Sequence, residues 1–352
     1  MSGFIITALV ILVFIVVYQL AKASEYTVVI QGEEKVAAKT NRLMAWLMLA
    51  FFVLGLFGLY KCHVYLVDML LPESASNHGD NYEFMLKWTL IVTGIVFFLT
   101  HIMLFYYIFK YQATDKRKAL FYSHNNTVEV LWTTIPAIAL LILVIIGLRN
   151  WSIMMDVAPK ESLQVEITGK QFAWIIRYPG PDGVFGQTDF RLINDANNVV
   201  GLDWDDPASR DDIIFENGQM HLIKDHPAHL IIKSRDVIHD VGLPHFRMKM
   251  DAVPGIVTTM WFTPKFTSQE MIDKTGNPDF IYEIACDQMC GNGHYSMRGT
   301  IIVETQQKFD AWLAQQTSYY DQHYGEVEVA EEATEIEEEE VSNDEVAIVD
   351  NN

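Results

Sequence analysis

A stretch of 12 residues near the C-terminus, CDQMCGNGHYSM at 286–297, gathers side chains that bind soft metals. It contains Cys286, Cys290, His294 and Met297 at intervals of four, four and three residues. Thiolates, imidazoles and thioethers are soft sulfur and nitrogen donors, which suit copper far better than magnesium or calcium. A disulfide, a surface histidine or a core methionine would explain each residue separately. The spacing of all four together favours a copper site.

Two glycines, Gly291 and Gly293, lie between these candidate ligands. A loop tight enough to turn all four side chains inward needs positive φ angles, which glycine adopts without steric cost. We therefore expect positive φ at both positions. The site is still incomplete, because one imidazole does not complete a centre in which two thiolates bridge metals.

The second imidazole must come from elsewhere in the chain, ideally from a strand-end loop that faces 286–297. His239, in the segment DVIHDV, is the favoured candidate, and His245 six residues later is the rival. The other histidines of this region lie in a polar segment and are predicted to be surface residues: His221, His226 and His229.

Charge and hydrophobicity are segregated along the 352-residue chain, whose length suits about two domains. The net charge is −20, and twelve of the excess negative charges lie in 325–352, a tail that we expect to be disordered. The rest carries −8, which disfavours nucleic acid and would attract a basic protein. Three cysteines are too few for a disulfide framework, no C-x-x-C-H heme motif occurs, and Cys62 is expected to be a lone packed thiol.

The apolar runs in the first 150 residues each approach the ~20 residues of a membrane-spanning helix. They are Phe4–Leu20, Leu43–Tyr60, Leu86–Phe109 and Val130–Leu148. The first ends in Ala21-Lys22-Ala23, which resembles a signal-peptidase site, but no basic side chain precedes the run. We expect a membrane anchor over 1–150 with four helices, or three after cleavage of a leader.

Basic residues orient this anchor, because cytoplasmic loops of membrane proteins are enriched in Lys and Arg. The loops after the first and third runs are basic, whereas the loop at 68–83 is acidic. The segment after Leu148 therefore emerges on the periplasmic side of the cell inner membrane. The basic residues are Lys22, Lys35, Lys39 and Arg42, then Lys110, Lys116, Arg117 and Lys118.

From Trp151 onward, short alternating runs replace the long apolar ones. Leu163, Val165 and Ile167 recur at period two, as in a half-buried strand. Further runs at 172–178, 229–234, 256–262, 280–285 and 300–303, separated by Pro, Gly and Asp, predict an all-β sandwich or barrel over 151–324. The polar stretch 189–218 is interpreted as an insertion on one edge. A closing helix at 305–316 would pack through Phe309, Trp312 and Leu313.

Three stretches resemble cytochrome c oxidase subunit II, over roughly Glu129 to Leu313. EVLWTTIPA at 129–137 is similar to the start of the family's last membrane helix. DVIH at 236–239 with MDAVPG at 250–255 is similar to its first ligand loop, and 286–297 to its copper loop. The resemblance implies a Greek-key cupredoxin domain that holds a binuclear copper centre, CuA. Its subunit would relay electrons, with the chemistry done in another subunit.

The resemblance also implies a role for each ligand. Cys286 and Cys290 would bridge two coppers, His239 and His294 would each cap one, Met297 would be an axial ligand of one copper, and the backbone carbonyl of Gln288 would be that of the other. His239 is preferred over His245 because only His239 has the family's Asp-Val-x-His context.

The chain departs from the family at two of its functional positions. In QFAW at 171–174, Trp174 matches the second of two tryptophans, but Phe172 replaces the one through which electrons usually enter. Gln288 stands where many members have a Glu that binds Mg²⁺ at the interface with subunit I, so the magnesium site is expected to be altered or absent. Glu129 corresponds to a glutamate near the family's proton-uptake pathway, although a carboxylate at a helix N-terminus is also stabilised by the dipole.

These features predict a membrane-anchored electron-transfer subunit of a respiratory terminal oxidase. It would accept electrons from a c-type cytochrome, or from a permanently docked donor complex, and pass them to heme in subunit I, where O₂ is reduced to water and protons are pumped. Subunits I and III and membrane lipid are the other expected partners. A copper-free quinol oxidase subunit II, the CuA domain of a nitrous oxide reductase and a copper-carrying assembly protein are the alternatives.

Overall fold

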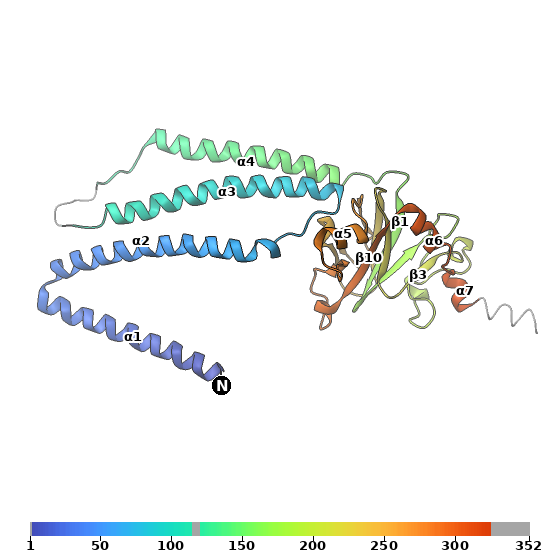
Figure 1. The fold of residues 1–352 in the computed structure, drawn as a ribbon, viewed down its shortest axis with the longest axis horizontal. Helices are drawn as coiled ribbons and strands as arrows, with labels where there is room; N and C mark the ends of the chain where they lie inside the picture. The colour runs from blue at the N-terminus through green and yellow to red at the C-terminus, as the bar shows by residue number, and fades with distance from the viewer. Residues whose placement is uncertain (1, 115–119, 325–352) are drawn as a thin grey trace, which may run out of the picture. The chain divides into compact units, whose positions relative to one another are not determined.

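The computed structural model describes residues 2–114 and 120–324. The predicted basic residues Lys116, Arg117 and Lys118 and the acidic tail 325–352 lie outside the described residues. The chain divides into two compact units: residues up to 70 together with 87–141, and residues 71–86 together with those from 142 onward (Figure 1).

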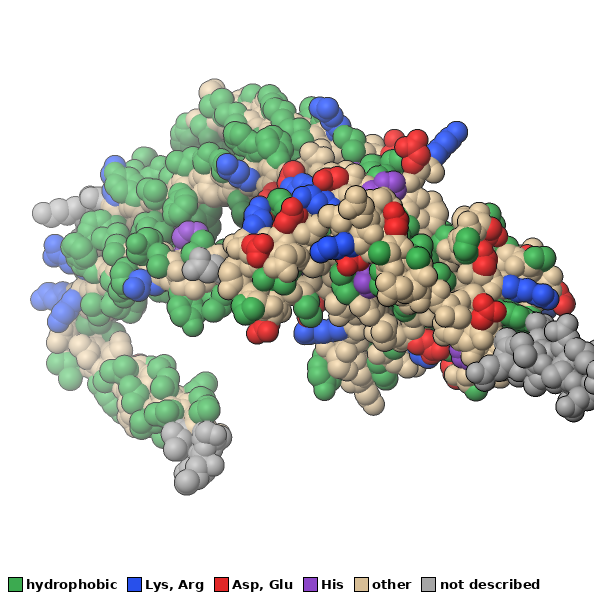
Figure 2. Space-filling view, turned by 45° about the vertical axis from the view of Figure 1, so that its right-hand side comes forward, with side chains coloured by type: hydrophobic (Ala, Val, Ile, Leu, Met, Phe, Trp, Pro, Cys, Tyr) green, Lys and Arg blue, Asp and Glu red, His purple; other side chains and the backbone are tan. Residues whose placement is uncertain are grey.

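The predicted membrane helices are confirmed. Within the described residues they are α1 (Ser2–Gln31), α2 (Glu33–Leu66), α3 (Asn77–Lys110) and α4 (Asn126–Met154), with a short 3-10 turn, η1 (Val67–Met69), after α2. All four are long and apolar enough to cross a membrane. Figure 2 shows hydrophobic side chains over these helices and acidic and basic ones over the β domain. Cys62 is exposed on α2, so the expectation of a packed thiol is wrong.

The region after α4 is a two-sheet β structure, as predicted. The first sheet has the strand order β3-β2-β1-β5-β8 and the second β4-β10-β9-β6-β7. Both sheets mix antiparallel ladders with one parallel pair, β1 with β5 and β10 with β4. The strands are β1 (Leu163–Lys170), β2 (Ala173–Tyr178), β3 (Ile213–Phe215), β4 (Gln219–Ile223), β5 (Ala228–Ser234), β6 (His239–Leu243), β7 (Met248–Ala252), β8 (Thr258–Phe262), β9 (Tyr282–Cys286) and β10 (Arg298–Glu304).

Short helical elements connect and close the sheets. The predicted closing helix is α6, in which Phe309 is buried and Trp312 and Leu313 pack against the same core. The insertion at 189–218 contains β3, which is the edge strand of its sheet, as expected for an edge insertion. The elements are η2 (Phe190–Leu192), η3 (Pro207–Ser209), η4 (Pro244–Phe246), α5 (Ser268–Thr275), η5 (His294–Ser296), α6 (Gln306–Leu313) and α7 (Tyr319–His323).

The core lies between the sheets and is filled by alternate residues. Val165 and Ile167 of β1 are fully buried, as their period predicted. His221 on β4 is buried as well: its ring stacks on Trp312 at 3.7 Å, and its Nδ1 lies 3.1 Å from Glu304. The expectation of a surface histidine is therefore wrong at His221, because β4 is covered by α6.

The connection between α2 and α3 packs against the β domain. Ala75 donates its N–H to the His245 carbonyl at 2.8 Å and accepts from the N–H of Lys265 at 2.8 Å. Ser76 Oγ donates to the Phe246 carbonyl at 2.6 Å. Ion pairs add to these contacts: Glu73–Lys274 (2.6 Å), Asp80–Lys265 (2.6 Å) and Glu83–Arg247 (2.8 Å). Residues 71–86 are therefore folded onto the β domain.

Candidate metal centre

The candidate ligands of 286–297 converge at the end of β9. Cys286 is the last residue of this strand, and both cysteine side chains are buried. Cys286 Sγ lies 3.8 Å from Cys290 Sγ. On the other side, Cys290 Sγ is 3.8 Å from His294 Nδ1 and 3.8 Å from Met297 Sδ. The loop thus folds two sulfurs, an imidazole and a thioether around one point.

The second imidazole belongs to His239. This residue begins β6, which pairs with β9 so that Val241 lies opposite Cys286. His239 Nδ1 is therefore 3.9 Å from Cys286 Sγ. The ring of His245 instead packs at 5.0 Å from the ring of Phe280 and 5.5 Å from that of Tyr282. The fold brings His239, and not His245, to the cysteines.

This donor set fits a soft metal. Ligand atoms of His239, Cys286 and Cys290 lie within 4.8 Å of one another. The Gln288 carbonyl adds an oxygen 3.2 Å from Cys286 Sγ. The sulfur–sulfur and sulfur–nitrogen contacts are 3.8–3.9 Å long, and thiol sulfur is only a weak hydrogen-bond donor and acceptor, so these groups bind one another weakly. Sulfur and imidazole donors around a small buried space are what copper prefers.

Burial opposes ionisation of the thiols when no cation is bound. Burial, together with a smaller contribution from the neighbouring Cys286 thiol, raises the pKa of the Cys290 thiol to about 11. A coordinating metal ion deprotonates its thiol ligands outright. The site is therefore built for a cation that supplies the missing positive charge.

Asp236 orients His239 from behind. Its Oδ1 accepts a hydrogen bond from His239 Nε2 at 2.8 Å, and its Oδ2 accepts from the backbone N–H of Gln171 at 2.7 Å. Burial alone would raise the pKa of Asp236, but these bonds and the Val237 N–H outweigh burial and lower the pKa. The bond at Nε2 leaves Nδ1 free to face Cys286, as outer carboxylates do for metal-binding histidines.

The two loop glycines are needed for different reasons. Gly291 has φ 137°, as predicted. Gly293 has φ −94°, so the expectation of positive φ there is wrong. Instead, a Cβ on Gly293 would lie 2.5 Å from Phe172 Cγ. The loop glycines thus accommodate a phenylalanine ring laid across the copper loop.

Supporting residues from β1 and from the turn between β1 and β2 complete the environment. A Cβ on Gly169 would lie 2.8 Å from His239 Cδ2, so only glycine leaves room for that ring. Gln171 Nε2 donates to the Cys290 carbonyl at 2.6 Å. Sequence reasoning did not assign Gly169 or Gln171 a role at the site. The available signals were that Gln171 is the first residue of the QFAW motif and that Gly169 lies two residues before it.

The two aromatic residues of QFAW differ in accessibility. Trp174 has 0% exposed surface and sits edge-on to His239, with ring centroids 5.9 Å apart. Phe172 is 38% exposed. Trp174 can therefore couple to His239 but cannot contact an external donor, whereas Phe172 can do so only with part of its ring.

Glu129 lies in the first turn of α4. Its Oε1 accepts the backbone N–H of Asn125 at 3.3 Å, while Asn125 Oδ1 accepts the N–H of Val128 at 3.1 Å. This reciprocal arrangement resembles a capping box and stabilises the helix start. Proton uptake through Glu129 remains a prediction.

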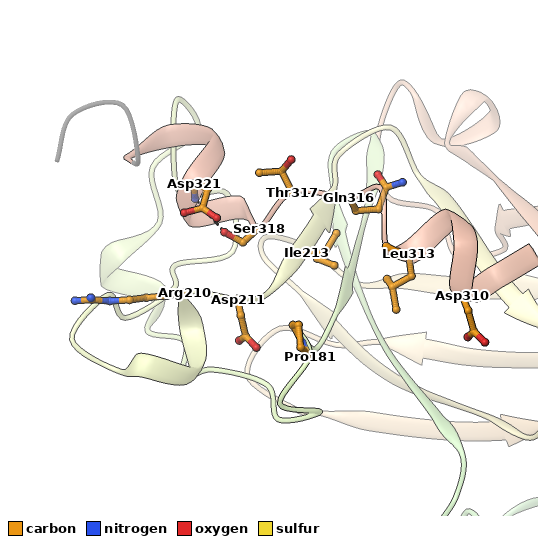
Figure 3. A pocket seen from close by; sticks show the side chains of 12 residues that line it. Pro181, Arg210, Asp211, Ile213, Asp310, Leu313, Gln316, Thr317, Ser318 and Asp321 are labelled. Atoms are coloured by element: carbon orange, nitrogen blue, oxygen red, sulfur yellow. Dashed lines mark hydrogen bonds between the residues drawn. The ribbon is translucent and has the colours of Figure 1, made fainter. Parts of the chain in front are cut away.

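A cavity of about 630 Å³ lies elsewhere in the β domain (Figure 3). Its walls include Pro181, Arg210, Asp211 and Leu313, together with residues that lead into α7. No predicted copper ligand lines this cavity. We therefore assign it no part in the metal site.

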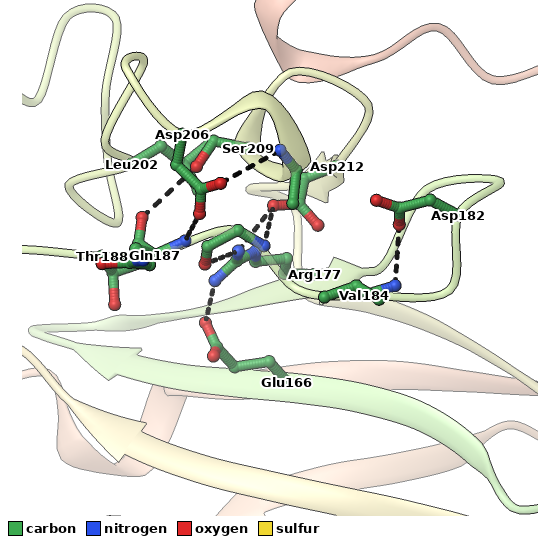
Figure 4. A network of polar contacts seen from close by, with 12 residues as sticks. Glu166, Arg177, Asp182, Val184, Gln187, Thr188, Leu202, Asp206, Ser209 and Asp212 are labelled. Carbon is green, nitrogen blue, oxygen red and sulfur yellow. Dashed lines mark hydrogen bonds and ion pairs between the residues drawn. The ribbon is translucent and has the colours of Figure 1, made fainter.

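A second buried polar cluster is centred on Arg177 (Figure 4). Its guanidinium donates to Asp212 Oδ2 at 2.5 Å, to Glu166 Oε1 at 3.2 Å and to the Gly186 carbonyl at 2.5 Å. Lys233 Nζ lies 2.6 Å from the other oxygen of Glu166. Burial raises the pKa of Asp212 to about 6, although Arg177 lowers it. The cluster fastens the 183–212 segment to the first sheet.

Comparisons with known proteins give a consistent answer. Residues 64–152 match the family described as cytochrome C oxidase subunit II, transmembrane domain, and residues 163–306 match its periplasmic domain. The alternative cytochrome c oxidase subunit 2 of Bradyrhizobium diazoefficiens is 35% identical over 66% of this chain and 78% of that protein. A probable cytochrome c oxidase subunit 2 of Rickettsia bellii is 30% identical over 64% of this chain and 74% of that protein.

Among solved structures, the periplasmic domain of subunit II of cytochrome oxidase of Bradyrhizobium japonicum is similar to this chain. It is 24% identical, covers 45% of this chain and 95% of its own, and has a TM-score of 0.30.

Proposed function

Because the chain belongs to the cytochrome c oxidase subunit II family, we propose that it is the electron-relay subunit of a respiratory terminal oxidase. It is a multi-pass membrane protein with a periplasmic C-terminal domain. It accepts electrons from a c-type cytochrome, or from a docked donor complex, and passes them to heme in subunit I. Subunit III and membrane lipid complete its surroundings.

The observation that carries the proposal is the convergence of soft donors from two separate segments. Cys286 and Cys290 would be the ligands shared by a pair of copper ions, and His239 and His294 would each bind one of them. Met297 and the Gln288 carbonyl would be the remaining ligands. When bound, such a centre supplies one-electron transfer with little change in geometry.

The chain's own residues prepare the site for this task. Asp236 holds His239 in the tautomer that turns Nδ1 toward Cys286. Gln171 fixes the Cys290 backbone, and Trp174 packs edge-on to His239. The neutral side chain of Gln288 is a poor ligand for a hard cation, so we propose that magnesium binding at the subunit I interface is weakened or lost.

The alternatives fit these observations less well. A copper-free quinol oxidase subunit would not need to retain every donor of the site. An assembly protein must release its copper, and therefore needs accessible ligands, whereas both cysteines here are buried. In the proposed relay, electrons enter on the face that carries Phe172, with Trp174 behind it.

The assignment is tested by the optical and EPR spectra of the oxidase complex containing the full chain. We expect the hyperfine pattern of one unpaired electron shared by two copper nuclei, and its loss in His239→Ala. His245→Ala is the matched control and should retain the pattern. A mononuclear or featureless spectrum in the unaltered protein would refute the proposal. Loss of the signal in His245→Ala alone would mean that His245, and not His239, is the copper ligand.

A further inference from the structure

The copper loop presents an aromatic ring that the ligand assignment does not use. Tyr295 follows His294 directly and is 82% exposed. Its side chain makes no hydrogen bond or ring contact with the other described residues. Its backbone belongs to η5, the turn that also presents the His294 imidazole. A large side chain is therefore held on the surface by the same turn that holds a copper ligand.

Other aromatic residues near the site are less suited to meet a donor. Trp174 is completely buried. The ring of Phe172 is spread over Gly291 and Gly293, within 3 Å of where their Cβ atoms would be, so much of its surface is turned toward the loop. Tyr295 offers the larger accessible ring. It also has the shorter covalent route, because only its own backbone separates the ring from His294.

The surface around Tyr295 carries little charge. Between the ligands of 286–297, the exposed side chains include Gln288, Met289 and Asn292, and the only formal charge within the stretch is Asp287. Arg298, just beyond it, carries the opposite sign. A sparsely charged face with a protruding ring suits an apolar planar group better than a highly charged one, because aromatic rings pack by offset stacking or edge contact. The exposed heme edge of a c-type cytochrome is such a group.

We propose that Tyr295 is the residue through which the donor cytochrome contacts the copper centre. This inference rests on the proposed relay function and names its donor-binding residue. One electron leaves the donor's ferrous heme iron, which becomes ferric, and reduces the copper pair through Tyr295 and His294. No bond is formed or broken, and no proton moves. The tyrosine ring provides contact and electronic coupling and is not itself oxidised.

The test compares two reductants on the intact oxidase. Oxidation of a reduced, soluble, basic c-type cytochrome should slow about tenfold or more in Tyr295→Ala, as expected for loss of a central aromatic contact. Tyr295→Phe should recover most of the rate, because the ring and not the hydroxyl makes the contact. Reduction of the copper centre by hexaammineruthenium(II), which needs no docking face, should be unaffected by either change.

Phe190→Ala is the matched control, because Phe190 is 76% exposed on η2 of the same domain. The copper spectrum of each protein is recorded first, so that failure of the proposed copper centre is recognised before rates are compared. An unchanged cytochrome rate in Tyr295→Ala would overturn the proposal. This is also the result expected if another subunit of the oxidase covered Tyr295. An equal slowing with hexaammineruthenium(II) would also overturn it, because the residue would then act only on the copper loop.

Discussion

The β domain holds two buried polar clusters that differ in how strongly their own groups interact. Around Arg177, acids, bases and a carbonyl meet at 2.5–3.2 Å, although Arg177 Nε and Asp212 Oδ1 have no hydrogen-bond partner among the described residues. Around Cys286 and Cys290, the sulfur and nitrogen donors stand 3.8–3.9 Å apart. The first cluster, called the closed cluster below, is held by its own ion pairs, whereas we propose that a metal ion completes the second.

This difference separates stability from function within one domain. Arg177 and Lys233 balance Glu166 and Asp212 in formal charge, so that cluster needs nothing from outside. The copper cluster instead combines sulfur donors with an imidazole that is aimed by Asp236. Changes at one cluster should therefore leave the properties of the other intact.

The largest effect is expected at Cys286 and Cys290, the proposed thiolate ligands. Cys290→Ser should abolish the two-copper EPR signal and lower cytochrome oxidation by more than about 100-fold, beyond what changes outside the ligand shell cost. Thermal unfolding of the metal-free protein should change little, because this cluster contributes few internal bonds. A large loss of metal-free stability would contradict the division between the clusters.

The converse experiment removes the charge from the closed cluster. Arg177→Met should destabilise the protein by about 3–5 kcal/mol, because it leaves buried carboxylates without their partner. Denaturant unfolding measures the loss, and the copper spectrum of the folded fraction should be unchanged. Arg191→Met is the control: its guanidinium is 76% exposed and 3.8 Å from Asp189, so the change should stay within about 0.5 kcal/mol.

The closed cluster also predicts a dependence on pH. The folded-state pKa of Asp212 is raised to about 6, above its ordinary value of 3.8, so the folded protein binds this proton more tightly than the unfolded chain. The resulting stabilisation is complete below about pH 4 and is lost as pH rises to about 6, on the order of 2–3 kcal/mol. Asp212→Asn cannot titrate at this position, so the unaltered protein should lose about that much stability relative to Asp212→Asn between about pH 4 and pH 6, as measured by unfolding free energies across that range. Parallel curves would refute the assignment.

A smaller effect is expected from a change at Asp236, which contacts the candidate ligand His239 but is not itself a ligand. Asp236→Asn retains the size of the side chain but removes the negative charge that faces His239 Nε2. Copper affinity should fall about 10–100-fold, as for other partners of metal-binding histidines. Competition with a copper chelator measures the change. Asp195→Asn, at an exposed partner of Arg235, is the control and should leave the affinity unaltered.

Sequence alone predicts the copper end better than the closed cluster. The candidate ligands of 286–297 are close together in the chain, so a metal site can be predicted from them without knowing the fold. The sequence indicated that a glycine is needed at position 293, but not why. Glycine is needed there because the ring of Phe172, a residue distant in the chain, packs against this position. The residues of the Arg177 cluster come from β1, β2, β5 and the 183–212 segment. Because they are far apart in the chain, no short sequence motif predicts the cluster.

Sequence reasoning missed β3, β4, β6 and β7, and two of these cases have a physical explanation. In β6, Val241 and Leu243 alternate with Asp240 and Gly242, but Asp and Gly are uncommon in strands, so the short run was not recognised as one. β4 is buried on both faces because α6 covers it, which also hid His221. β1 was predictable because Val165 and Ile167 alternate with more polar side chains.

The contact between 71–86 and the β domain has a consequence for biosynthesis. Ser76 leaves the ribosome 170 residues before Phe246, the residue whose carbonyl it binds. Residues 71–86 must therefore wait without their partner while α3 and α4 are inserted and most of the β domain is exported. The ion pairs of Glu73, Asp80 and Glu83 can form only after Arg247, Lys265 and Lys274 have been exported, so these contacts are completed shortly before the candidate metal loop at 286–297 follows.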